Sequence, residues 1–339
     1  MRELHQAILA ISGKTVNHAI IDPMFELIFL GTAASAPSAW RNLPSTLVFH
    51  DDRRFVVDVG EGSQRQLLKS GVGFKRLNTV LLTHGHLDHI LGLGGLISTF
   101  ARWEAIDTFD IYGGRATLER VRDLMKVVIR GGEVKVKIHL IEIEPGVIIQ
   151  GKGFSVSAFP VNHRGGSSFG FAFDEPPRRP FLADEATRLG VPAGPERRDL
   201  VAGRPITLAN GVTVLPDQVL GPEIPGVRVV YIGDVTRAEG LVEAAAGADA
   251  LVIEATFAAA DVELARSFGH ITASESAEIA RAAGVRQLYL THISRRYNGR
   301  ELEAEARAIF PRTIVVDDLD HYRVTRDDPC QRVRATDDQ

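Results

Sequence analysis

The chain is almost free of cysteine: among its 339 residues only Cys330, near the C-terminus, is of this type. A disulfide framework and a cysteine-based zinc finger are therefore excluded, because each needs several thiols. Any bound metal must be held by histidines and carboxylates. The sequence also lacks an apolar run close to the roughly 20 residues of a membrane-spanning helix, and its N-terminus has no signal-peptide pattern. We therefore expect no membrane association and a cytoplasmic location.

A strong net charge is also missing, since the formal charge is −4. The chain as a whole does not attract nucleic acid, so a polyanionic substrate would have to meet a local basic patch. Hydrophobic residues make up 45% of the sequence, which is enough to bury a substantial core. We expect one large domain or two closely joined ones.

Short apolar segments followed by glycine-rich polar loops recur along the chain. The segments that we expect to form strands are 25–32, 45–50, 54–60, 78–84, 108–113, 154–163, 168–174, 227–234, 248–257, 286–294 and 313–318. Helices are expected at 62–71, 115–128, 237–247 and 272–284, the last with Thr272 as its N-cap. This order indicates an α/β fold, as a four-layer αββα sandwich. Periodicity alone also allows a doubly wound parallel sheet.

The ends of the chain and one internal segment differ in composition from the rest. We expect an N-terminal extension over 1–24, a domain over 25–325 and a polar, frayed tail over 326–339. Within the domain, residues at about 174–203 are rich in proline, glycine and arginine. They are interpreted as a protruding arm, whose arginines form either a solvated surface or a contact with a polyanion.

Four potential metal ligands are crowded into six positions, directly after an apolar segment. They are His84, His86, Asp88 and His89. Residues two apart on an extended segment point the same way, so His84 and His86 can bind one ion. Asp88 and His89 come where the chain turns into a helix and can face a second ion.

Three further ligand candidates, His163, Asp234 and His292, each follow an expected strand. Neighbouring strands can deliver such residues to one rim of a sheet. In a workable scheme the two ions are bound by His84, His86 and His163, and by Asp88, His89 and His292, with Asp234 as a bridge. Two Zn²⁺ per subunit are the first choice for such nitrogen and oxygen donors, with Mn²⁺ or Fe²⁺ as alternatives. A water shared by two ions is a strong nucleophile towards phosphorus, and Asp88 is well placed to orient or deprotonate it.

The pattern H-x-H-x-D-H with later His, Asp and His resembles the metallo-β-lactamase superfamily. The surrounding sequence motifs resemble those of ribonuclease Z, a family of tRNA 3′-processing endonucleases. They occur in the family's order from about residue 25 to about residue 318. They include "FLGTAASAPS", "VVDVGEGSQRQLLKS", "NHRGGSSFGF" and "LTHISRRY". The resemblance implies a metallo-β-lactamase-type sandwich with an arm. It further implies a homodimer that removes 3′ trailers from precursor tRNA and leaves a tRNA 3′-hydroxyl.

Glu254 and His270 resemble the paired Glu and His with which the family passes a proton to the departing oxygen. In the alternative reading Glu254 only ends a strand and His270 only precedes the helix that starts after Thr272. The sequence departs from the family pattern around this pair, at Ile253, Ile271 and Val235, which leaves its surroundings less polar than usual.

Substrate contacts are suggested at two places. Arg296 and Tyr297 match the family's residues beside the last metal histidine, where a guanidinium can bind a phosphate. Alternatively, the arginine forms an ion pair at the surface. Ser63 and Gln64 open a helix and are either anion contacts or a simple cap. The segment "PSAWRN" resembles the loop that senses the tRNA 3′ end, but it has Ala39 where many members have Lys.

Two competing hypotheses remain at this stage. A hydrolase of small phosphodiesters or other esters would keep the same two-ion site, but it has no use for the arm. An RNA-binding relative without activity would have no need of the intact metal set. A 3′-extended tRNA as substrate distinguishes these hypotheses from the endoribonuclease.

Overall fold

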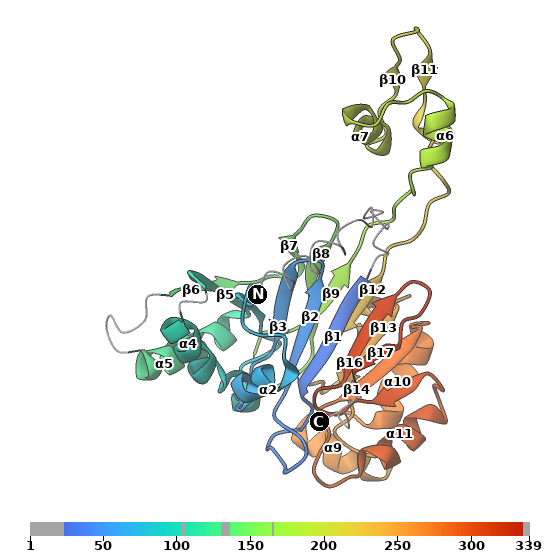
Figure 1. Cartoon of the computed structure of the whole chain (residues 1–339). Coiled ribbons are helices and arrows are strands. Elements are labelled where there is room, and N and C mark those ends of the chain that lie inside the picture. The colour runs from blue at the N-terminus through green and yellow to red at the C-terminus, as the bar shows by residue number, and fades with distance from the viewer. Residues whose placement is uncertain (1–23, 104–105, 130–135, 165, 335–339) are drawn as a thin grey trace, which may run out of the picture.

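The computed structural model describes residues 24–103, 106–129, 136–164 and 166–334. The extension expected over 1–24 lies, apart from Met24, outside these residues. Two large sheets lie face to face, with helices on the outer side of each (Figure 1). The predicted four-layer αββα sandwich is therefore confirmed, and the doubly wound single sheet is not formed. No helix of the described residues is both long enough and apolar enough to cross a membrane.

The first sheet has eight strands in the order β17-β16-β1-β2-β3-β4-β5-β6. Their bounds are β1 Met24–Gly31, β2 Ser45–His50, β3 Arg53–Val57, β4 Thr79–Leu81, β5 Thr108–Gly113, β6 Lys137–Glu142, β16 His321–Thr325 and β17 Gln331–Arg334. Strands β3 to β6 are parallel. The strand β1 is antiparallel to β2, which is antiparallel to β3, so β1 and β4 end on the same side.

The second sheet has seven strands in the order β15-β14-β13-β12-β9-β8-β7. Their bounds are β7 Gly146–Gln150, β8 Ser155–Val161, β9 Ser168–Asp174, β12 Arg228–Tyr231, β13 Ala250–Glu254, β14 Gln287–Thr291 and β15 Thr313–Val315. Strand β9 is antiparallel to both β8 and β12, while β12 to β15 are parallel. Strands β8, β12, β13 and β14 therefore end at one common rim.

The alternation of side chains along each strand separates two kinds of core. On β1, Phe25, Leu27 and Phe29 pack into the space between the sheets, whereas Ile28 and Leu30 pack towards the helices. This period of two is what a strand needs when both of its faces are covered. The apolar strands predicted from the sequence are apolar for this reason.

Helices cover the outer face of each sheet. Over the first lie α2 Ser63–Ser70, α4 Leu93–Trp103 and α5 Arg115–Val128, and over the second lie α8 Leu241–Ala244, α10 Ala273–Ala282 and α11 Gly299–Arg307. The short α3 Leu87–Ile90, η2 Ala259–Asp261 and α9 Val262–Phe268 lie in connections. Thr272 caps α10 as predicted, since its hydroxyl accepts from the Glu275 amide at 3.3 Å.

The arm projects from the end of the second sheet, between β9 and β12 (Figure 1). It extends over 175–227, well beyond the predicted 174–203, and contains α6 Ala183–Arg188, α7 Pro195–Val201, β10 Ile206–Thr207, β11 Thr213–Val214 and η1 Pro216–Gln218. It has a small core of its own, formed by Ala186, Val191, Leu200, Val214 and Val219. At its neck, the backbones of Arg178 and Ile224 exchange hydrogen bonds of 2.9 and 2.7 Å.

The polar C-terminal segment is folded as far as Arg334, because β17 pairs with β16. Polar contacts hold it in place: the Tyr289 hydroxyl donates to the Pro329 carbonyl at 2.8 Å, and Arg332 pairs with Asp320 at 2.6 Å. The frayed tail expected over 326–339 is thus replaced by an edge strand, and residues 335–339 lie outside the described part. A hydropathy pattern does not predict such a strand, because most of its residues are polar and hydrogen bonds rather than apolar contacts hold it.

Candidate metal centre

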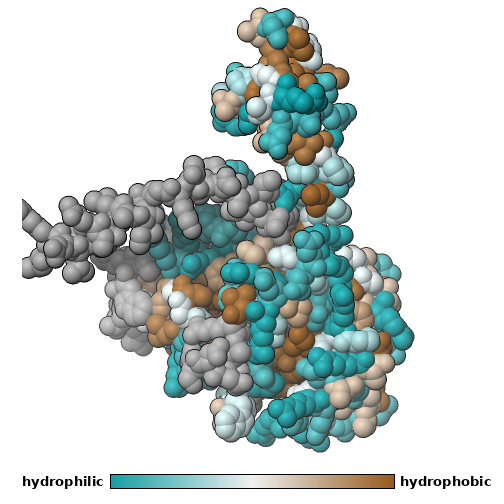
Figure 2. Space-filling model, turned by 45° about the vertical axis from the view of Figure 1, so that its right-hand side comes forward, coloured by the Kyte–Doolittle hydropathy of each residue, from teal (hydrophilic) through white to brown (hydrophobic). Residues whose placement is uncertain are grey.

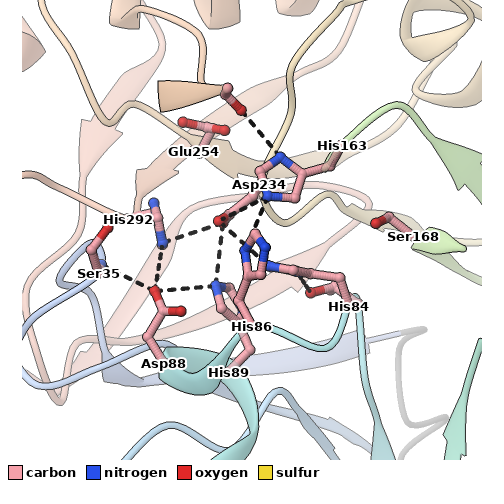
Figure 3. A network of polar contacts seen from close by, with 12 residues as sticks. Ser35, His84, His86, Asp88, His89, His163, Ser168, Asp234, Glu254 and His292 are labelled. Atoms are coloured by element: carbon pink, nitrogen blue, oxygen red, sulfur yellow. Dashed lines mark hydrogen bonds and ion pairs between the residues drawn. The ribbon is translucent and has the colours of Figure 1, made fainter. Parts of the chain in front are cut away.

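Loops at one rim of the sandwich bring seven ligand candidates together (Figure 3). One set of ligand atoms, all within 4.8 Å of one another, comes from His84, His86, His163 and Asp234, and another from Asp88, His89 and His292. The grouping coincides with the two ligand sets expected from the sequence. The first four residues of the motif follow β4 of the first sheet, while His163, Asp234 and His292 follow β8, β12 and β14 of the second. Both sheets build the rim, where sequence reasoning expected one.

The Asp234 carboxylate lies between the two sets and is buried. Its Oδ2 is 3.6 Å from His84 Nε2 and 3.7 Å from His163 Nε2. Its Oδ1 is 3.3 Å from His89 Nε2 and 3.2 Å from His292 Nε2. Two ligand atoms bound tetrahedrally to zinc at about 2.0–2.1 Å lie roughly 3.4 Å apart. Each carboxylate oxygen thus sits at ligand spacing from a different set of histidines.

Most of the histidine rings are oriented from behind through Nδ1. The contacts are His84 to Thr83 Oγ1 at 3.1 Å, His89 to Asp58 Oδ2 at 2.8 Å, His163 to the Gly269 carbonyl at 3.1 Å and His292 to Thr256 Oγ1 at 2.9 Å. Such contacts fix the ring and leave Nε2 for an ion. His86 differs, because its Nδ1 faces His163 Nε2 at 3.3 Å and so points into the centre.

The inward-facing atoms lack partners of their own. Nε2 of His84, His89 and His292 and Oδ1 of Asp234 are buried and find no hydrogen-bond partner among the described residues. Buried polar atoms are nearly always paired, so this concentration calls for a missing partner. A divalent cation accepts donors of these types at this spacing, and the residues therefore fit a metal.

The pKa values of the ligand histidines shift in opposite directions. Burial holds the pKa of His84 well below its usual range and lowers that of His163 to about 4, so both rings are neutral and can bind a metal. Burial also works against a proton on His89, but the carboxylates of Asp234, Asp58 and Asp88 outweigh it and raise its pKa. A metal ion would replace that proton, because it also places positive charge beside these carboxylates.

His270 and Glu254 form a pair beside the two sets. His270 Nδ1 lies 3.1 Å from Oε1 of the fully buried Glu254. Burial opposes a charged His270, but the Glu254 carboxylate prevails and raises the pKa of His270 to about 9. One of its ring nitrogens lies within 4.8 Å of ligand atoms of Asp234 and His292. A protonated imidazole cannot bind a metal, but it can donate a proton.

The apolar departures around this pair face away from the centre. Ile253, Ile271 and Val235 are fully buried in the core between the second sheet and its helices. The Val235 amide still donates to Glu254 Oε1 at 2.6 Å. The Thr256 hydroxyl also donates to this carboxylate, so Glu254 keeps polar partners.

Sequence reasoning missed the two residues that make the shortest contacts to Nδ1 of the ligand histidines, Asp58 and Thr256. Asp58 follows β3 by one residue and accepts from Thr83 N and Thr83 Oγ1 at 2.8 Å each, in addition to His89. Thr256 faces His292 in the same way. Asp58 lies in "VVDVG", a strand followed by a polar residue, so the rule that found Asp234 could have found it. Ser35, Asp58 and His292 have the same positive φ of 57°, which is uncommon for such residues, so backbone strain gathers at the rim.

The predicted substrate contacts are only partly near the centre. Ser63 is fully buried and its hydroxyl donates to the Gly60 carbonyl at 2.7 Å, while the Gln64 amide is taken by Thr99. Both side chains therefore have protein partners in this structure, and a role of Ser63 and Gln64 in substrate binding stays a prediction. Arg296 is exposed and follows His292 by four residues, and the Tyr297 hydroxyl donates to Asp261.

Comparisons with known proteins show which families this chain is similar to. Family models for the metallo-beta-lactamase superfamily and for a beta-lactamase superfamily domain match residues 40–175 and 201–293. The ribonuclease Z of Bradyrhizobium diazoefficiens is 47% identical over 301 residues, which are 89% of this chain and 100% of the relative. That of Methanothermobacter thermautotrophicus is 36% identical, over 87% of this chain and 95% of the relative.

Two solved structures share the fold. The short form of human tRNase Z has a TM-score of 0.62 at 23% identity, covering 87% of this chain and 98% of that one. The metallo-beta-lactamase fold protein YhfI of Bacillus subtilis has a TM-score of 0.64 at 20% identity, covering 89% and 100%.

Proposed function

The chain belongs to the ribonuclease Z family of the metallo-β-lactamase superfamily, and we propose that it cuts precursor tRNA at the 3′ side with a pair of divalent ions. It is a metal-dependent endoribonuclease that processes tRNA 3′ ends. The observation that carries the two-ion proposal is the Asp234 carboxylate, whose two oxygens each face different histidines. Zinc is the first choice because the donors are mainly imidazole nitrogens.

The seven ligand candidates, His84, His86, Asp88, His89, His163, Asp234 and His292, would hold this pair. When bound, two such ions acidify a water molecule and offset the charge that develops at phosphorus during an in-line displacement. Asp88 is fixed for its part by the Ser35 amide, which donates to Oδ2 at 3.0 Å. Its second carboxylate oxygen is then available to orient the attacking water.

His270 is the proton donor of the proposal. Its Nδ1 is engaged by Glu254, so Nε2 is left to protonate the departing 3′-oxygen of the tRNA nucleotide. Glu254 keeps the ring protonated and in place. This step needs only a short movement of one proton from Nε2 to the oxygen as the bond to phosphorus breaks. The tRNA then ends in a 3′-hydroxyl and the trailer begins with a 5′-phosphate.

The arm supports precursor tRNA as the substrate and a homodimer as the working form. It leaves the second sheet where β9 ends and β12 begins, whereas Asp234 follows the other end of β12. Six residues of extended chain, roughly 20 Å, separate Arg228 from Asp234. A tRNA held by the arm therefore lies away from the metal rim of the same chain, and a second copy could offer its rim instead. Work on precursor tRNA is also the reason to expect the chain in the cytoplasm.

Exposed Arg296 beside the rim is proposed to bind a phosphate of the substrate, with Tyr297 packed next to it. The ring of Tyr297 meets Phe257 edge-on at 6.3 Å, which supports the loop that carries the arginine. A guanidinium is suited to this task because it can donate two parallel hydrogen bonds to one phosphate.

The decisive experiment uses a transcript of tRNA with a 3′ trailer. We expect one cut at the start of the trailer, a 3′-hydroxyl on the tRNA, complete loss of cleavage with a chelator and recovery with Zn²⁺. Metal analysis should give two equivalents per chain. Hydrolysis of a small phosphodiester without any cut in the transcript would instead favour the hydrolase of small substrates, and a single equivalent would refute the two-ion scheme.

A further inference from the structure

Exposed aromatic rings are rare among the side chains that the structure describes. Among the aromatic side chains that the structure describes, only Trp40 and Phe268 are exposed, at 87% and 58%. The other phenylalanines and the tyrosines among these residues are buried or half-buried. Each exposed ring lies on a segment whose backbone contacts the metal centre. The two segments contact different ligand sets.

Trp40 lies on the loop between β1 and β2, whose base is tied to the second ligand set. The Ser35 amide donates to Asp88 Oδ2 at 3.0 Å, and Ala34 N donates to the Ile293 carbonyl, next to His292, at 3.0 Å. Five residues of chain reach at most about 18 Å, so the Trp40 ring stays within a few nucleotides of the centre.

The tip of this loop is a defined turn rather than a loose excursion. The Ser38 amide donates to the Arg41 carbonyl at 2.9 Å, and the Ser38 hydroxyl accepts from the amides of Trp40 and Arg41. The Arg41 guanidinium donates to the Val316 carbonyl at 2.6 Å. A fixed backbone therefore holds a large apolar ring in solvent.

Phe268 ends α9 and is tied to the first ligand set. Its neighbour Gly269 has φ 81° and accepts from His163 Nδ1 at 3.1 Å. The Phe268 ring stacks on the buried Phe257 ring, with centroids 6.2 Å apart and planes at 15°. Phe268 is nevertheless 58% exposed, so much of its ring is open to solvent. The Arg164 guanidinium donates to the Ser267 carbonyl at 2.6 Å and steadies the end of this helix.

We propose that Trp40 and Phe268 are stacking platforms that hold unpaired nucleobases on the two sides of the scissile phosphate. The inference rests on the proposed function. Phe268 lies two residues from the proton donor His270, so it receives the base of the tRNA nucleotide whose 3′-oxygen leaves. Trp40, attached to the opposite ligand set, receives a base of the trailer. Free aromatic faces suit single-stranded RNA, because every base has a π face that stacks regardless of sequence.

The surroundings favour RNA over a protein partner as the occupant. Trp40 is flanked in the chain by Ala39 and Arg41, and Phe268 by Ser267 and Gly269, so neither ring belongs to a run of large apolar side chains such as a protein interface uses. Arginines that are also exposed lie close in sequence to the same ligand sets: Arg164 follows His163, and Arg295 and Arg296 follow His292. Rings that stack on bases and cations that pair with phosphates are the two kinds of contact that unpaired RNA needs.

The test for Trp40 combines a protein change with an RNA change. Trp40→Leu keeps an apolar side chain without a ring, and Trp40→Phe keeps a ring. We expect Trp40→Leu to lower kcat/KM on 3′-extended tRNA about 5- to 100-fold and Trp40→Phe to recover most of it. An abasic nucleotide in the first trailer positions should slow the native enzyme similarly but leave Trp40→Leu almost unchanged. Equal cleavage rates for Trp40→Leu and Trp40→Phe would refute stacking by Trp40. So would an abasic nucleotide that slows Trp40→Leu by the same factor as it slows the native enzyme.

The test for Phe268 is the same with the base on the other side of the cut. Phe268→Leu should lose sensitivity to an abasic last tRNA nucleotide, while Phe268→Tyr keeps it. Val127→Ala, an exposed apolar position at 78% on α5, is the matched control and should change neither rate. Metal content should be normal in all variants. Sensitivity of Phe268→Leu equal to that of the native enzyme would remove Phe268 from the proposal.

A binding measurement separates this inference from the proposed reaction. Trp103→Phe leaves Trp40 as the only tryptophan, and a stacked base quenches indole fluorescence. Titration of the metal-loaded variant with a short unpaired RNA should quench the signal, whether or not the chain cuts tRNA. An unchanged signal at saturating RNA would overturn the role of Trp40 even if cleavage were normal.

Discussion

The metal rim and the arm are built in opposite ways. At the rim, side chains from both sheets are buried, and four histidine rings are fixed from behind by Thr83, Asp58, Gly269 and Thr256. The arm instead folds on five buried apolar residues and joins the body through a narrow neck (Figure 2). Apolar and polar residues are mixed on its visible surface. Under the proposed function, the chemistry belongs to the rigidly held rim and tRNA recognition belongs to a segment that the two-sheet core does not need.

Asp234→Ala should produce the largest effect, because it removes the residue shared by both ligand sets. We expect loss of bound metal and a drop of at least about a thousandfold in cleavage of both 3′-extended tRNA and bis(p-nitrophenyl) phosphate. Asp249→Ala is the matched control: Asp249 is equally buried but pairs with Arg286 at 2.9 Å at the other end of β13. It should lower the free energy of unfolding and keep the metal. Full activity of Asp234→Ala would refute the bridge.

His270→Ala should separate proton donation from metal binding within the rim. Cleavage of tRNA is expected to slow about 10²- to 10⁴-fold with unchanged metal content, because the 3′-oxygen needs a proton. Hydrolysis of bis(p-nitrophenyl) phosphate should be much less affected, since nitrophenolate leaves readily without one. His139→Ala, a half-exposed histidine paired with Asp110 at 2.7 Å, serves as control. Loss of metal from His270→Ala would mean that His270 is a ligand.

Replacing residues 179–223 by a short Gly-Ser link should sharpen the difference between rim and arm. The neck residues Arg178 and Ile224 are already neighbours, so the body can close without the arm. We expect kcat/KM on tRNA to fall about 10- to 100-fold, equivalent to about 1.4–2.8 kcal/mol, with hydrolysis of the small diester and metal content unchanged. Equal losses on the two substrates would show that the arm supports the rim rather than the tRNA.

Leu200→Ala should give the smallest effect on activity. The side chain is fully buried in the arm core, and its loss costs about 2–5 kcal/mol locally. We expect faster hydrogen exchange within the arm, a modest loss on tRNA and an unchanged melting temperature of the body. Leu302→Ala, equally buried in α11, should lower that melting temperature instead. A common melting shift in both variants would mean that arm and body unfold as one unit.

Much of this organisation follows from local pattern. The strands expected from apolar runs are all present, and the rule of a polar residue after a strand located Asp234 and His292. That rule works because strands running the same way end at the same rim. Sequence reasoning failed where tertiary contacts decide: β17 is held by pairing with β16, which hydropathy does not register.

The arm's extent and the use of both sheets could not be read from the sequence for a related reason. The short strands of the arm carry few apolar residues, and its core becomes visible only when Leu200 and Val214 are seen together. Which sheet a strand joins depends on pairing between residues far apart, as for β16 with β1. Local periodicity carries no information about such partners.

The closed neck of the arm has a consequence for how this protein can change over generations. The two segments of the neck pair at Arg178 and Ile224. Insertion, deletion or replacement of residues between these two positions therefore leaves the register of β9 and β12 untouched. The arm can therefore change in length and sequence between descendants while the two sheets that carry the metal rim stay as they are.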